Sequence, residues 1–152
     1  MGPNGSQTAF VGNGKHVAHC VSVFGNCRAP NDEEGGTQCS FNLQLKWMAE
    51  TTSSIYATPV ITDLYADGYK EVVVPSFVHH LEVFQGDNGA QAAGFPAFHE
   101  DKVHASPLLY DIDHDGIQDI VLSTYSGEIL FYQDTAKKLP VALSLPSLPV
   151  DR

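Results

Sequence analysis

The feature that most constrains this chain is an internal repeat. Segment 57–63 (ATPVITD) aligns with segment 105–111 (ASPLLYD) at a fixed offset in residue number (111 − 63 = 48). The same register continues without a gap through four further pairs: Asp67 and Asp115, Gly68 and Gly116, Val73 and Val121, and Gln85 and Gln133. Chance similarity between two β-rich segments does not explain matching Asp, Asp-Gly and Ala-x-Pro positions in one fixed register. We therefore expect two copies of one structural unit.

Short strand patterns fill both units. Residues 41–47 alternate apolar and polar side chains, which is the period of a half-buried strand, and β-branched runs occupy 72–74 and 120–122. Residues 81–84 and 129–132 predict further strands. No stretch combines helical periodicity, a cap and enough helix formers to predict a helix. The sequence therefore predicts an all-β fold, and a period near 50 with about four strands per unit is typical of β-propeller blades.

The chain is too short for a closed propeller, which needs about four to eight blades. It has room for about two blades and a partial one, to which 41–47 would contribute the outer strand. We expect the blades to span 37–136 as an incomplete propeller, in a truncated gene product or a fragment of a longer protein. The open blade faces would need partner chains to cover them.

The two ends differ in composition from this central region. Residues 1–36 are rich in Gly and Asn, and only 21–24 (VSVF) looks strand-like, so we expect a flexible or irregular leader there. Residues 137–152 contain three prolines. Prolines at this spacing forbid a helix and favour an extended tail, with one edge strand followed by a loose end.

The balance of charge limits the classes of partner. Acidic residues outnumber basic ones by 18 to 8, which gives a formal net charge of −10. Such a surface repels phosphate backbones and anionic lipid, so we expect neither nucleic acid nor a membrane surface as partner. No apolar window approaches the length of a membrane-spanning helix. The three cysteines, Cys20, Cys27 and Cys39, leave open both one disulfide with a free thiol and three reduced thiols.

Acidic residues concentrate in two loops that the repeat register matches. The second Asp loop, 111–119 (DIDHDGIQD), has carboxylates at positions 1, 3, 5 and 9. Calcium takes roughly 6–8 oxygen ligands at flexible angles, which a curled loop with alternate inward carboxylates supplies. Without a cation these carboxylates would repel one another, although a bare Asp-Gly turn is the alternative. The predicted calcium ligands are Asp111, Asp113, Asp115, the backbone carbonyl of Ile117, and Asp119.

The first Asp loop, 63–71 (DLYADGYKE), is a degraded copy of the second. Tyr65 replaces the ligand at position 3, and Lys70 adds a positive charge. A weak calcium site and a turn that has lost its metal are both open here. The remaining candidate ligands are Asp63, Asp67, the carbonyl of Tyr69, and Glu71.

Other metal and catalytic chemistry finds little support in the sequence. The seven histidines show no ligand spacing with Cys or a carboxylate that would favour zinc. No serine lies in a nucleophile-elbow motif, and no carboxylate pair outside the Asp loops stands out as an acid and base. We therefore predict no catalytic residue, no organic cofactor and no enzymatic activity.

The Asp loops resemble the FG-GAP repeats of integrin α-chain propellers and related surface proteins. The resemblance runs from about residue 37 to 134 and is strongest at 53–59 (SSIYATP), 74–79 (VPSFVH) and 104–113 (HASPLLYDID). It implies calcium at the second Asp loop, a cell-surface or secretory-pathway setting, and a role in adhesion or wall assembly. Tyr65 departs from the family pattern, which has Asn or Asp at that position.

The leading hypothesis is a calcium-binding FG-GAP repeat module of a cell-surface or secreted protein, acting in recognition, adhesion or assembly of a cell wall or matrix. Its expected partners are a protein or polysaccharide at the cell surface, and further blades from another chain. We expect it outside the cell or in the secretory pathway, although no secretory signal pattern is visible. The alternatives are a fragment of a propeller polysaccharide lyase or hydrolase, and an intracellular protein–protein scaffold with vestigial loops.

Overall fold

Every regular element in the described part of the protein is a β-strand, so the predicted all-β class is confirmed. The structure is a computed structural model, and it describes residues 6–12, 17–26, 40–140 and 143–144. The strands of this part form three antiparallel sheets. In the same residues we find no helix with the length and hydrophobicity that a bilayer span requires.

Each sheet is a simple meander in which chain neighbours pair. The N-terminal sheet has the order β1-β2-β3 and contains β1 (Ser6–Gly12), β2 (Val17–Asn26) and β3 (Ser40–Glu50). The middle sheet has the order β4-β5-β6-β7 and contains β4 (Val60–Thr62), β5 (Glu71–Pro75), β6 (His79–Gln85) and β7 (Ala97–His99). The C-terminal sheet has the order β11-β10-β9-β8 and contains β8 (Leu108–Tyr110), β9 (Asp119–Ser123), β10 (Glu128–Tyr132) and β11 (Leu143–Ser144).

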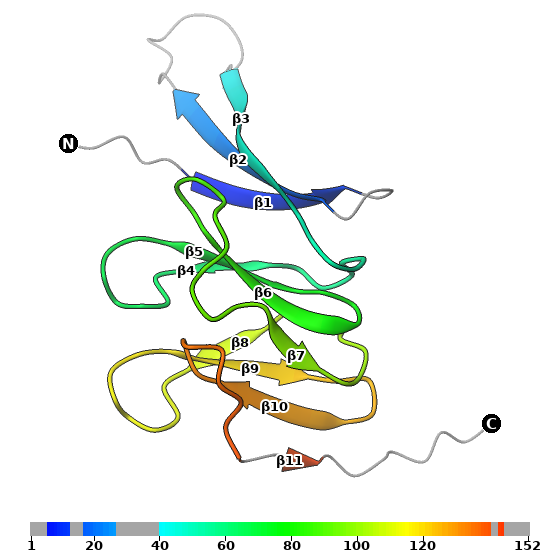
Figure 1. The fold of residues 1–152 in the computed structure, drawn as a ribbon. Helices are drawn as coiled ribbons and strands as arrows, with labels where there is room; N and C mark the ends of the chain where they lie inside the picture. The colour runs from blue at the N-terminus through cyan, green and yellow to red at the C-terminus, as the bar shows by residue number, and fades with distance from the viewer. Residues whose placement is uncertain (1–5, 13–16, 27–39, 141–142, 145–152) are drawn as a thin grey trace, which may run out of the picture.

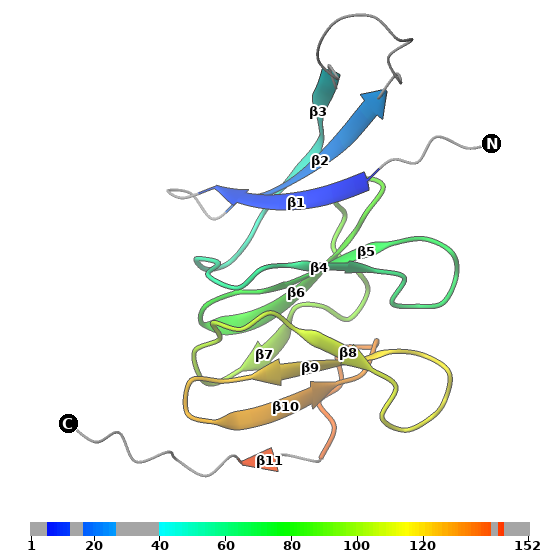
Figure 2. The ribbon, with the colours of Figure 1, turned by 180° about the vertical axis from the view of Figure 1, so that it is seen from behind.

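The three sheets lie one above another along the molecule (Figure 1 and Figure 2). The loops that join β4 to β5 and β8 to β9 project at one edge of this stack. The β5–β6 and β9–β10 turns lie at the opposite edge. The two Asp loops therefore share one edge of the molecule, and the hairpin turns share the other.

The strands predicted from residue patterns are confirmed. The predicted segments fall within the observed strands as follows: 41–47 in β3, 72–74 in β5, 81–84 in β6, 120–122 in β9, and 129–132 in β10. Period-2 alternation and β-branched runs were sufficient signals because these strands have at least one packed face.

The core lies on both faces of β5, because successive side chains of a strand point to opposite sides. All the residues of β5 are buried. Val73 joins the cluster shared with the C-terminal sheet, which Ile120 and Leu122 enter from β9. Val72 joins a second cluster with Trp47 of β3. The middle sheet is thus the inner layer, which explains why its apolar run is continuous instead of alternating.

The sequence repeat reappears as equivalent strands. β8 and β9 begin one repeat period after β4 and β5 (108 − 60 = 48 and 119 − 71 = 48). The hairpins differ, because Gly127 takes φ 91° before β10 whereas His79, its match in the register, takes φ 77°. A left-handed φ favours glycine, so the middle sheet holds a side chain in a strained backbone position. In the outer strand, the described residues of β11 pair with Glu128 and Ile129.

The prediction of an irregular N-terminal segment is wrong for residues 6–12 and 17–26, which form β1 and β2. Every residue of β2 pairs with β3, so backbone ladder bonds hold a strand inside a region whose Gly and Asn content as a whole favours loops. Composition gives no sign of such long-range pairing. The rest of the predicted leader, Cys27, Cys39 and the tail beyond Ser144 lie outside the described residues.

Candidate metal centre

The second Asp loop connects β8 to β9 and is wound around the side chain of Asp111. Asp111 Oδ1 accepts a hydrogen bond from the Asp115 backbone N–H at 3.1 Å, and Asp111 Oδ2 accepts one from the Gly116 N–H at 3.0 Å. Asp115 Oδ1 accepts a further bond from the Ile117 N–H at 2.8 Å. Gly116 has a φ of 92°, a left-handed value that lets the chain reverse within a few residues.

This winding brings together the side chains predicted at positions 1, 3 and 5. Single carboxylate oxygens of Asp111, Asp113 and Asp115 all lie within 4.8 Å of one another. Asp113 and Asp115 are exposed, and Asp111 is half-buried. Asp119 is not a member of this group; it is buried, and its Oδ2 accepts the Ile112 N–H at 2.9 Å.

The most buried of these carboxylates, Asp119, has a raised pKa. The pKa of Asp119 is raised mainly by burial, and the negative charges of Asp113, Asp115 and Asp111 add to it. A hydrogen bond from the Ile112 N–H acts in the opposite direction. A cation beside these groups would favour their charged forms. The donors are all hard oxygens, which suits calcium or magnesium and does not suit zinc.

The first Asp loop repeats the same bonding pattern. Asp63 Oδ1 accepts the Asp67 N–H at 3.0 Å, and Asp63 Oδ2 accepts the Gly68 N–H at 2.9 Å. Asp67 Oδ1 accepts the Tyr69 N–H at 2.8 Å. Each bond has its counterpart one repeat period later, with distances of 3.1, 3.0 and 2.8 Å. The shape of the loop therefore does not depend on the residue at position 3, where the two copies differ.

Position 3 separates the two loops chemically. Tyr65 is half-buried and packs against the core cluster between the middle and C-terminal sheets, whereas Asp113 offers a carboxylate. Glu71 is the counterpart of Asp119: it is buried, and its Oε2 accepts the Leu64 N–H at 2.9 Å. Burial is the main cause that raises the pKa of Glu71. Within the described residues, the second loop alone gathers three metal-ligating side chains.

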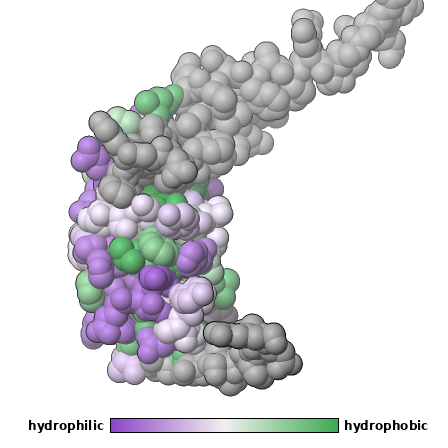
Figure 3. Space-filling view, turned by 90° about the vertical axis from the view of Figure 1, so that its right-hand side faces the viewer, coloured by the Kyte–Doolittle hydropathy of each residue, from purple (hydrophilic) through white to green (hydrophobic). Residues whose placement is uncertain are grey.

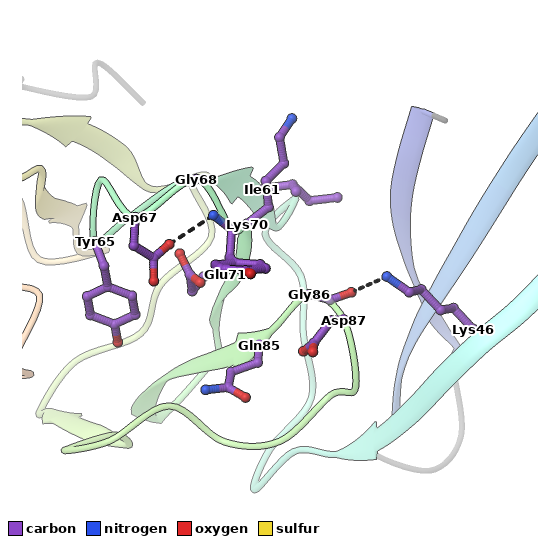
Figure 4. A pocket seen from close by; sticks show the side chains of 11 residues that line it. Lys46, Ile61, Tyr65, Asp67, Gly68, Lys70, Glu71, Gln85, Gly86 and Asp87 are labelled. Atoms are coloured by element: carbon purple, nitrogen blue, oxygen red, sulfur yellow. Dashed lines mark hydrogen bonds between the residues drawn. The ribbon is translucent and has the colours of Figure 1, made fainter. Parts of the chain in front are cut away.

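A pocket of about 560 Å³ lies beside the first Asp loop (Figure 4). Lys46 reaches from β3 to this pocket, where its Nζ donates to the Gly86 carbonyl at 2.9 Å. Trp47 Nε1 donates to the same carbonyl at 3.1 Å. Residues of the N-terminal sheet and of the β6–β7 connection therefore meet at this pocket, and the Gly86 carbonyl bonds them together. Its lining is Lys46, Ile61, Tyr65, Asp67, Gly68, Tyr69, Lys70, Glu71, Gln85, Gly86 and Asp87.

Two residues near these sites were not predicted as functional candidates from the sequence. Gln133 Nε2 donates to Asp113 Oδ2 at 3.2 Å, so it orients a predicted ligand. Its match with Gln85 in the repeat register was the available signal. Lys46 carried no signal at all, because its contact with Gly86 depends on the approach of two sheets that are distant in sequence.

A buried polar group in the middle sheet was also missed. Glu82 is buried, and its Oε1 accepts hydrogen bonds from the Thr52 N–H and Oγ1, each at 2.8 Å. Ser76 Oγ lies 3.5 Å from the same oxygen, whereas His99 Nδ1 donates to the Asp101 carbonyl at 2.7 Å. A serine nucleophile would need its base within hydrogen-bond reach. The described contacts do not pair Ser76 with His99 in that way.

Comparisons with known proteins do not assign this chain to a family. No family model, no curated protein and no solved structure matches the chain. The resemblance to FG-GAP repeats therefore stays a prediction.

Proposed function

We propose that this chain is a calcium-binding repeat module of a cell-surface or secreted protein, acting in recognition, adhesion or assembly of a wall or matrix. The observation that carries the proposal is the second Asp loop. There a hydrogen-bonded turn gathers the carboxylates of Asp111, Asp113 and Asp115 within 4.8 Å of one another. The backbone N–H groups already bonded to Asp111 and Asp115 fix these carboxylates before any ion arrives.

Calcium suits this loop better than other common metals. It tolerates irregular shells of oxygen ligands, and the exposed end of the loop leaves room for water to complete the shell. The predicted carbonyl of Ile117 would supply a further oxygen, and Asp119 would supply the carboxylate oxygen that does not accept the Ile112 N–H. Without a bidentate Glu at position 12, where Leu122 stands, we expect a Kd on the order of 10⁻⁴–10⁻³ M, as in extracellular modules. Such a site fills outside the cell and stays empty in the cytosol.

The proposal treats the middle and C-terminal sheets as two β-propeller-type blades of FG-GAP kind. Both are four-stranded antiparallel meanders that pack face to face, and their strands keep the repeat register (119 − 71 = 48). Propellers consist of such sheets arranged radially. Leu108 and Leu143 of the C-terminal sheet are exposed, so further blades, from this protein or a partner, would find an apolar surface there.

The test is thermal unfolding of the chain in EGTA and in calcium, with Asp113→Ala beside the wild type. A ligand that binds only the folded state stabilises it by RT ln(1 + [L]/Kd). At about 10 mM calcium the expected Kd gives about 1.4–2.7 kcal/mol. We therefore expect a calcium-dependent rise in Tm that Asp113→Ala abolishes. Asp87→Ala removes an exposed carboxylate outside both loops and should leave the rise intact.

Two results would contradict the proposal. A wild type whose Tm is the same in EGTA and calcium would leave the loop as a turn and favour the intracellular scaffold. A rise that persists in Asp113→Ala would show that calcium acts somewhere other than the second Asp loop.

A further inference from the structure

Four aromatic rings form a row at the edge of the stack opposite the Asp loops. Tyr56 and His104 follow one another with centroids 5.8 Å apart, and Phe77 packs edge to face against both of them, with its centroid 4.9 Å from each. His104 lies 5.8 Å from Tyr125. The two ends of the row are open to solvent, because Tyr56 is 64% and Tyr125 is 78% exposed.

Backbone hydrogen bonds hold the segments that carry this row. The Phe77 N–H donates to the Ser54 carbonyl at 2.7 Å, and the Val103 N–H donates to the Phe77 carbonyl at 3.0 Å. The Tyr125 N–H donates to the Lys102 carbonyl at 2.8 Å. These bonds link the hairpin turn of each sheet to the connection that precedes β4 or β8. A surface fixed in this way loses little conformational freedom when it binds a ligand.

The row is itself a repeat. His104 lies one repeat period after Tyr56, and Tyr125 lies one repeat period after Phe77 (104 − 56 = 48 and 125 − 77 = 48). Each four-stranded unit therefore contributes one aromatic pair at the same place. A surface that repeats along the stack suits a ligand that repeats along its length, as a polymer does.

The chemistry of the row suits sugar rings. A tyrosine presents a large apolar ring with a hydroxyl at its tip, and it loses little entropy when it is fixed. A sugar ring likewise has a C–H face and a rim of hydroxyls. Figure 3 looks onto this edge and shows small hydrophobic patches bordered by hydrophilic side chains. A protein partner would need a broader surface, because stable protein interfaces bury about 800 Å² on each side.

Charge favours a neutral polymer over an acidic one. Beside the row, the positive charge of Lys102, whose Nζ lies 5.8 Å from the centroid of Phe77, is offset by the neighbouring negative Asp101, whose carboxylate accepts the Ser126 N–H at 2.6 Å. The chain as a whole carries a formal charge of −10, which repels polyanions.

We infer that the row formed by Tyr56, Phe77, His104 and Tyr125 binds a neutral linear polysaccharide. The inference rests on the proposed recognition function but not on the calcium site. The two sites lie at opposite edges of the stack, and separate variants test them.

The experiment is affinity electrophoresis of the full chain in native gels that contain a soluble neutral β-glucan, a soluble xylan or polygalacturonate. We expect a neutral polysaccharide to retard the wild type, and we expect Tyr56→Ala/Tyr125→Ala to weaken binding about tenfold or more. The ring-preserving Tyr56→Phe/Tyr125→Phe should keep most of the binding. Tyr110→Ala removes a tyrosine of similar exposure, 59%, at the other edge and should bind as the wild type does.

Folding is checked separately by the Tm of each variant. An alanine variant that keeps the wild-type Tm and its calcium response but loses retardation supports the inference, even if other tyrosines modulate it. Three results overturn it: no retardation of the wild type by either neutral polymer, retardation by polygalacturonate alone, or equal retardation of the alanine variant. None of these bears on calcium, whose test uses Asp113→Ala.

Discussion

Asp101 joins the connection before β8 to the β9–β10 turn through its side chain. Its carboxylate accepts the Ser126 N–H at 2.6 Å. Hydrogen bonds from Ser126, together with the Lys102 N–H, lower the pKa of Asp101 from 3.8 to about 2. Such bonds favour the charged form of the acid because they place donors against it.

This shift has a defined pH dependence. Because the pKa of Asp101 is lower in the folded state, its contribution to stability is present above its unfolded pKa of 3.8 and is lost as the pH falls toward about 2. We expect the carboxyl carbon resonance of Asp101 to titrate with a midpoint near 2 in the folded chain. Replacement of Ser126 with Pro removes the donating N–H and should move the midpoint upward. A midpoint at the ordinary value in the wild type would contradict the bond.

Single residues of the candidate site were predictable where the chain itself places them close together. Asp111, Asp113 and Asp115 alternate along one curled loop, so their spacing alone predicted that they would meet, as they do. Spacing did not predict that Asp119 would be buried with one oxygen committed to the Ile112 N–H. That arrangement depends on the packing of β9, to which Asp119 belongs.

At the scale of the element, the two Asp loops are a matched pair. They share three backbone-to-carboxylate hydrogen bonds with nearly equal lengths, and they differ at position 3. Because the first loop keeps the skeleton without the third carboxylate, restoring that carboxylate should restore a site. The change needed is Tyr65→Asp.

We expect Tyr65→Asp to raise the calcium stoichiometry from about one to about two ions per chain, as measured by equilibrium dialysis. Asp113→Tyr, the reciprocal change in the second loop, should lower it instead. Tyr65 also packs against the core, so the variant should unfold more easily in EGTA and recover part of that loss in calcium. A wild type that already binds two ions, or a variant that gains none, would contradict this assignment of position 3.

The strands show what sequence patterns do and do not reveal about elements. β5 and β9 were visible as β-branched runs, because burial selects such residues. β1 was not visible, and β2 was visible only at 21–24, because the Gly and Asn residues around these strands favour loops. Register also escaped prediction, including the bulge between Cys20 and Val21.

At the scale of the whole molecule, Trp47 fastens the N-terminal sheet to the middle sheet. Its ring is 8% exposed and packs in a cluster with Val72, Val74 and Phe84. Its Nε1 donates to the Gly86 carbonyl at 3.1 Å. Of the β3 side chains that the structure describes, residues 45–50, Trp47 is the buried one.

Trp47→Ala removes this fastening. We expect a loss of about 3–5 kcal/mol in unfolding free energy, as for large-to-small changes of buried aromatic residues. Hydrogen exchange should also quicken in β3 more than in β9. Leu45→Ala is the matched control, because Leu45 lies in the same strand and is 60% exposed; its effect should stay within about 0.5 kcal/mol. Equal effects of the two variants, measured by denaturant unfolding, would contradict this role of Trp47.

The shared skeleton of the Asp loops also bears on how such a chain changes over generations. A turn that is fixed by bonds from its backbone to the carboxylates at positions 1 and 5 can gain or lose an ion by one substitution at position 3, with no change in the strands around it. One copy can then accumulate substitutions at position 3 while the other copy keeps its metal ligands. Tandem duplication of such a unit would yield proteins that differ in the number of metal ions they bind and yet share one fold.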